Sequence, residues 1–94
     1  MPVSVAARRG LAFALKSDKA AAEIVTMIDG GAGGTLSVDT KRRLEIAFVD
    51  RQTAAEMVTL VQSASSAASP NLRNRMGIML GARHLANEIV LETA

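Results

Sequence analysis

Three glutamates recur at one place in an internal repeat and are the side chains of this sequence best suited to chemistry: Glu23, Glu56 and Glu88. A cluster of three carboxylates can bind a metal ion, because hard cations prefer several oxygen ligands. No His or Asp recurs beside these glutamates, however, and the chain contains no Cys. The sequence therefore predicts no metal site, and we expect the three glutamates to set the register of the repeat.

Arginines are the partners that we expect for these glutamates, within one unit or between neighbouring units. Arg9, Arg43 and Arg75 are suitably placed in the repeat. An exposed ion pair of this kind stabilises a fold by less than about 1 kcal/mol. Replacing Glu56 with Ala is thus expected to cost little stability.

No catalytic set can be assembled from the remaining residues. The single histidine, His84, corresponds to Lys19 and Gln52 in the other copies, which indicates an exposed position. Residues 30–34 are rich in glycine but match neither G-x-G-x-x-G nor a P-loop, so we interpret them as a linker. The sequence predicts a protein that is not an enzyme and needs no cofactor.

Basic side chains recur at the same step of each copy and are candidates for an electrostatic interaction surface. Gathered on one side of the molecule, they would meet phosphates or an acidic protein surface. Ordinary solvated helix faces are the alternative, and the absence of Tyr and Trp argues against stacking on single-stranded nucleic acid. The candidates are Arg8, Arg9, Lys41, Arg42, Arg43, Arg73 and Arg75.

The elements that must position these side chains are three copies of one helical pattern, at residues 4–28, 37–61 and 69–91. A period of about 32 residues is typical of a supersecondary unit that buries its apolar face against its neighbours. A Gly-rich linker at 29–36 and a Ser/Ala linker at 62–68 separate the copies. Besides the glutamates, all three copies share Ser (Ser4, Ser37, Ser69), Ala (Ala21, Ala54, Ala86) and Val (Val25, Val58, Val90).

Each copy begins with a serine that can cap a helix, and a charged residue interrupts its apolar stripe midway, at Asp18, Arg51 and Arg83. Ser17 or Asp50 is suited to cap a second helix at this break. We therefore expect two short helices per copy, with one kinked helix as the alternative. The predicted fold is all-α, with the three units packed as one small bundle in a single domain spanning residues 1–94.

The composition suggests a module of modest stability that gains burial from a partner. Its apolar residues are dominated by Ala, and Phe13 and Phe48 are the two aromatic residues. The start of the chain does not match a signal peptide, and no apolar run approaches the roughly 20 residues that span a bilayer. We expect a soluble protein without a membrane partner.

The segment LSVDTKRRLEIAF at residues 36–48, followed by AAEMV at 54–58, resembles Ala-rich helical repeats of structural proteins from tailed bacteriophages. Residues 9–14 with 21–24, and 75–80 with 86–89, are similar but looser matches. The resemblance implies a small head-associated or decoration protein of the virion. The resemblance gives no catalytic residues to carry over to this chain.

The leading hypothesis is a non-enzymatic assembly protein that binds copies of itself or a capsid protein, located in the virion if phage-encoded and otherwise in the cytoplasm. A basic DNA-binding or regulatory module is the alternative, and an adaptor or antitoxin-like module is a third. The sequence leaves open the partner, the oligomeric state, and whether the basic clusters meet protein or DNA.

Overall fold

The computed structural model describes residues 3–30, 34–62 and 68–93, and these residues form six α-helices and no strand. The all-α prediction is confirmed, and each unit consists of two short helices, not one kinked helix. The helices are α1 (Val5–Leu15), α2 (Asp18–Gly30), α3 (Val38–Phe48), α4 (Arg51–Gln62), α5 (Pro70–Leu80) and α6 (Arg83–Thr93). Asp29, Gly30 and Gln62, which we expected in linkers, instead end α2 and α4, whereas linker residues 31–33 and 63–67 lie outside the described part.

Serine caps begin the first helix of every unit, as predicted. The hydroxyls of Ser4, Ser37 and Ser69 accept hydrogen bonds from backbone N–H groups three residues later. Each serine has an extended backbone conformation, which is usual for an N-cap. Pro70 follows the third cap at the first helical position, where its missing N–H costs nothing.

A residue in the left-handed conformation ends each first helix: Lys16, Val49 and Gly81, with φ of 55°, 54° and 81°. This conformation turns the chain so that the second helix can fold back on the first. Ser17 then accepts from the N–H of Ala20, and Asp50 accepts from the N–H of Gln52. The predicted break is thus confirmed, and two of the three second helices begin at a capping side chain.

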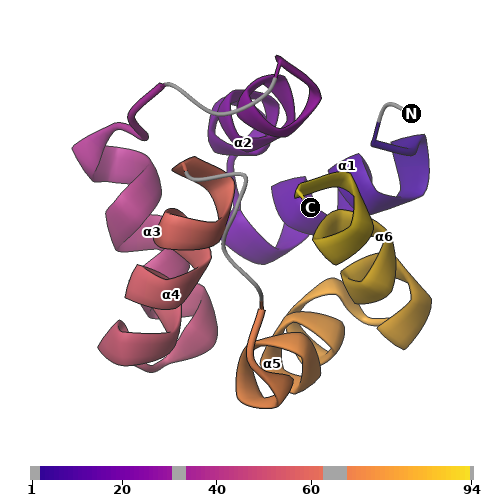
Figure 1. Ribbon diagram of the computed structural model, residues 1–94. Helices are drawn as coiled ribbons and strands as arrows, with labels where there is room; N and C mark the ends of the chain where they lie inside the picture. Colours follow the sequence, from indigo (N-terminus) through magenta and orange to yellow (C-terminus); the bar gives the residue numbers. More distant parts are fainter. Residues whose placement is uncertain (1–2, 31–33, 63–67, 94) are drawn as a thin grey trace.

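The helices pair into three hairpins, α1–α2, α3–α4 and α5–α6, arranged around a common centre, with α6 packed beside α1 (Figure 1). Each first helix buries one stripe at every fourth residue, for example Ala7, Leu11 and Leu15 on α1. Together with the second helices and Leu36, these stripes form one apolar core. Burial of each large aliphatic side chain there contributes about 1.5 to 3 kcal/mol.

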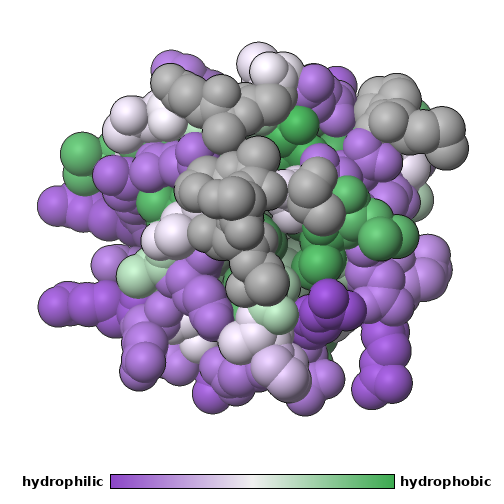
Figure 2. Space-filling model, viewed as in Figure 1, coloured by the Kyte–Doolittle hydropathy of each residue, from purple (hydrophilic) through white to green (hydrophobic). Residues whose placement is uncertain are grey.

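The surface is mixed in character. On the face in Figure 2, hydrophilic side chains dominate the lower rim, over α3, α4 and α5, and apolar side chains form small separate patches. No helix in the described part of the chain has the length and apolar character needed to cross a membrane.

Candidate functional site

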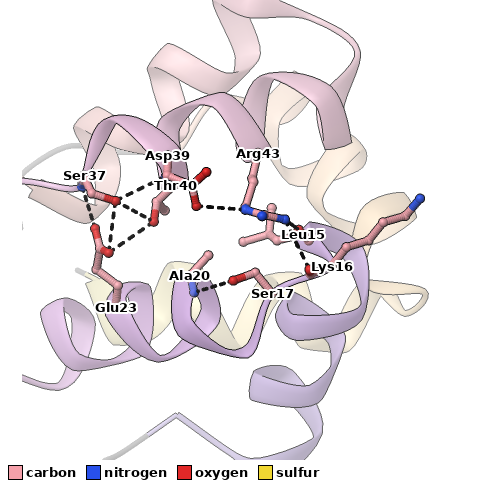
Figure 3. A network of polar contacts seen from close by, with 9 residues as sticks. All are labelled: Leu15, Lys16, Ser17, Ala20, Glu23, Ser37, Asp39, Thr40 and Arg43. Carbon is pink, nitrogen blue, oxygen red and sulfur yellow. Dashed lines mark hydrogen bonds and ion pairs between the residues drawn. The ribbon is translucent and has the colours of Figure 1, made fainter.

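The recurrent glutamates hold the capping serines of the neighbouring unit. Glu23 on α2 accepts hydrogen bonds from the backbone N–H and the hydroxyl of Ser37, at 2.5 and 3.2 Å, and from the hydroxyl of Thr40 at 3.2 Å. Figure 3 shows this carboxylate directed at the start of α3. A negative charge at a helix N-terminus is favourable, because the unpaired N–H groups there carry partial positive charge. Each carboxylate therefore supports the start of the next unit.

The same contact recurs around the molecule and closes it into a ring. Glu56 accepts from the hydroxyl of Ser69 at 2.8 Å. Glu88, in the last unit, accepts from the N–H and the hydroxyl of Ser4 in the first, at 2.6 and 2.8 Å. The expected arginine partners were wrong, because serines at helix starts occupy the carboxylates. The role of these glutamates in setting the register stays a prediction.

Two of the expected arginines bind main-chain carbonyls at the same junctions. Arg43 Nη1 donates to the carbonyl oxygens of Leu15 and Lys16 at 2.9 and 3.2 Å (Figure 3). Arg75 Nη1 donates in the same way to the carbonyl of Phe48 at 3.1 Å. A cation suits the C-terminal end of a helix, where carbonyl groups lack partners. These two candidates therefore join units, so they are committed within the fold.

The third junction, between the last unit and the first, has a glycine where the other two have arginine. Gly10 on α1 corresponds to Arg43 and Arg75 in the repeat. A Cβ atom at Gly10 would lie 3.3 Å from both the carbonyl oxygen and a methyl carbon of Leu80. Close packing of α1 against the end of α5 therefore forms this junction.

The remaining basic candidates lie on the surface, spread over three helices. Arg8, Arg9, Arg42 and Arg73 are exposed and Lys41 is half-buried. Arg73 lines a groove of about 660 Å³ together with Arg83 at the start of α6. The structure thus divides the predicted basic set into residues that join units and residues that remain accessible.

Sequence analysis did not identify the exposed apolar residues of the three first helices. Phe13, Ile46 and Ile78 occupy equivalent positions and are 87%, 76% and 81% exposed. We call these three residues the apolar triad. Each lies two residues from two members of the buried stripe of its helix, and therefore on the opposite side of the helix. That spacing, with an apolar residue in all three copies, was the available signal.

Val49, which follows α3, is another exposed apolar residue. It is 86% exposed, and its φ is positive. Val49 and Ile78 line the same depression, of about 360 Å³, at the junction of α3 and α5. Arg75 forms part of its wall. The depression is thus apolar with a cationic edge.

The described residues contain no group of three or more His or acidic side chains that would hold a metal ion. His84 is exposed, as its counterparts predicted. The pKa of Asp50 is lowered. A hydrogen bond from the Thr53 hydroxyl, at 2.8 Å, holds the pKa of the Asp50 carboxyl below the ordinary value of 3.8. That shift belongs to a helix cap, and Asp50 also lies 3.9 Å from Arg75.

No protein family, curated protein or solved structure matches this chain at a significant level.

Proposed function

We propose that this chain is a non-enzymatic assembly protein that binds a protein surface present in many copies. In the more specific form of this proposal, which the resemblance to phage proteins suggests, the assembly is a virion. The observation that carries the proposal is the apolar triad. Three large apolar side chains lie outside the core at equivalent places. Such residues gain free energy by leaving water when a partner covers them.

The contacts of the recurrent glutamates and of two arginines support this assignment. Glu23, Glu56 and Glu88 are engaged at helix starts, and Arg43 and Arg75 at helix ends. Each of these groups therefore acts in building the ring, which is a suitable scaffold for presenting a surface.

The test is the mass of the complex that the tagged chain carries from its native lysate, measured by light scattering before and after nuclease treatment. A nuclease-resistant particle that contains a repeated partner protein, and that persists in moderate salt, is the expected result. A complex of one chain with one partner would instead favour an adaptor.

Nucleic-acid binding is the second candidate, favoured by Arg73 and Arg83 in the groove between α5 and α6. It requires collapse of the complex on nuclease treatment. It also requires an affinity that falls log-linearly with salt, because phosphate contacts release counterions.

A further inference from the structure

The third hairpin has a groove between its two helices in which the charged side chains are all positive. The groove has a volume of about 660 Å³, and Arg73 on α5 and Arg83 at the start of α6 line it. A smaller hollow of about 230 Å³ shares both arginines and is also lined by Asn87 on α6. Among the residues that the structure describes, no acidic side chain lines either hollow. We call the two hollows together the cationic groove.

The first two hairpins each contain an acid at the places that correspond to this groove. Two of these places lie on the first helix of a hairpin and one lies at the start of the second: Arg73, Gly77 and Arg83 in unit three, Lys41, Glu45 and Arg51 in unit two, and Arg8, Ala12 and Asp18 in unit one. Units one and two thus offset their cations with a carboxylate. Unit three has two arginines at these places and no acid.

Gly77 is the residue that makes unit three different from unit two. In unit two, Oε2 of Glu45 lies 3.9 Å from Nε of Arg51. Gly77 stands at the place of Glu45 and lines the groove, so both the volume and the charge of a glutamate side chain are missing there. Within the described part of the chain, neither Arg73 nor Arg83 has an acidic partner. The groove therefore has room for a carboxylate and two cations that lack one.

We propose that the cationic groove binds an acidic segment of the partner protein, with a carboxylate of that segment beside Arg83 in the way that Glu45 lies beside Arg51. The inference rests on the proposed function, and it names the chemistry of the partner and the hairpin that meets it.

The other groups of the groove suit a peptide ligand. An arginine presents a planar set of N–H donors that matches a carboxylate with two parallel hydrogen bonds. Asn74 and Asn87 border the same arginines, and a side-chain amide can both donate to and accept from a peptide backbone. Ala82 stands where Ser17 and Asp50 cap the other second helices, so it offers no side-chain acceptor that would offset the partial positive charge at the start of α6.

The extent of the groove favours a short protein segment over a nucleic-acid backbone. Binding to duplex DNA depends on several phosphates, spaced regularly along the backbone, being neutralised together. Here the uncompensated pair of arginines belongs to one hairpin, because the corresponding places of the other two contain Asp18 and Glu45. Two arginines in one groove match one or two carboxylates.

Titration of the isotope-labelled full chain with a capped hexaglutamate peptide tests this inference, with the backbone amide signals followed by NMR. The signals of Gly77, Gly81 and Arg83 should shift in a saturable way, because these residues line the groove. A capped hexaglutamine peptide is the control for charge, and a short duplex DNA at the same concentration and at physiological salt is the nucleic-acid arm.

Gly77→Glu is the most direct variant, because it gives unit three the acid that unit two has. A Cβ atom at Gly77 meets its nearest neighbour at an ordinary 3.5 Å, and helix interiors favour other residues over glycine, so the variant should fold. Its carboxylate should compete for Arg83 and raise the Kd for hexaglutamate about tenfold or more. Gly77→Gln fills the same space without a charge, and it should raise the Kd clearly less.

The two arginines are tested one at a time. Arg73→Gln and Arg83→Gln should each raise the Kd for hexaglutamate about three- to tenfold, as expected for exposed charge pairs. Arg51→Gln is the matched control at the equivalent place of unit two, because the side chain of Arg51 is exposed and already lies beside Glu45. Thermal unfolding verifies that each variant folds.

Three outcomes would overturn the inference: no shift of the groove signals with hexaglutamate, equal Kd values for Gly77→Glu and Gly77→Gln, or an equal effect of Arg51→Gln. Each would leave the assembly proposal intact, since that proposal depends on the apolar triad. Shifts of the groove signals at lower concentrations of DNA than of hexaglutamate would replace the acidic protein segment with a nucleic acid. Failure of the proposed function is distinguishable, because it appears as the absence of a nuclease-resistant particle in the light-scattering test.

Discussion

Glu23 illustrates how one side chain links two units. Its carboxylate accepts three hydrogen bonds from the first turn of α3, two of them from the serine that caps that helix. Bonds to an ionised acceptor are stronger than those between neutral groups. The glutamate thus stabilises both a helix start and an interface between units.

Glu23→Ala is expected to lower the free energy of unfolding by about 1 to 3 kcal/mol, because it leaves the donors of Ser37 without this acceptor. Chemical denaturation measures the change. Glu45→Ala is the matched control: among the described residues, the ion-pair partner of Glu45 is exposed Arg51 at 3.9 Å, so this variant should lose less than about 1 kcal/mol. Equal losses for both variants would refute the assigned role of Glu23.

Asp50 gives a prediction for pH dependence. Because its pKa is lower in the folded state than its ordinary 3.8, ionised Asp50 stabilises the fold above that pH. This contribution fades as pH falls through the lowered pKa of the folded state. Asp50→Asn retains a capping oxygen but no charge, so stability should fall less between about pH 6 and about pH 3 than in the parent. Denaturation of both proteins at the two pH values measures these losses of stability. Equal losses for Asp50→Asn and the parent would contradict the assigned role of the Asp50 charge.

The hairpin is the unit of structure at the scale of elements. In each one, a serine-capped first helix ends at a left-handed residue, and the second helix returns along it. The left-handed position is filled by Lys, Val and Gly in the three units, although only Gly adopts this conformation without steric cost. The backbone requirement is therefore constant while the side chain varies.

Substitutions at this position should act in opposite directions in two units. Val49→Gly is expected to stabilise the protein by about 1 kcal/mol, because it relieves strain and removes no buried side chain. Gly81→Val should destabilise it by at least about 1 kcal/mol, since φ there is also positive. Thermal unfolding of both variants measures the pair. Destabilisation by Val49→Gly would mean that the Val49 side chain contributes to the fold.

At the scale of the whole molecule, three sequential hairpins close into a ring. The closing contacts join residues far apart in the chain: Ser4 to Glu88, and Gly10 to Leu80. The arginine found at the other two junctions is absent from this one. The ring is therefore repetitive in its hydrogen bonds to serine but not in its helix-end contacts.

Alanine substitutions at two helical glycines, Gly10 and Gly77, test the close contact at this junction. Gly77→Ala on α5 should stabilise the protein by about 0.5 to 1 kcal/mol, because helix interiors favour Ala and the new methyl group meets its nearest neighbour at an ordinary 3.5 Å. Gly10→Ala should give none of this gain, since its methyl group would lie 3.3 Å from the backbone of Leu80. Equal gains in denaturant midpoint would show that the junction tolerates a wider spacing.

The sequence by itself determined the repeat, the all-α fold, the serine caps and the break in each unit. These features depend on contacts within a few residues: a hydroxyl bonds an N–H three positions on, and an apolar stripe follows the helical period. The recurrence of Glu23, Glu56 and Glu88 likewise indicated a role in register.

Only the tertiary structure decided the partners of those glutamates and the exposure of the triad. Glu88 bonds Ser4 because the third hairpin packs against the first, and no local pattern encodes that contact. Both arginine and serine were chemically suitable partners, so the choice depended on which helix end each carboxylate reached. Phe13 is apolar like Phe48, yet one is exposed and the other buried, because packing of the hairpins covers one side of each first helix.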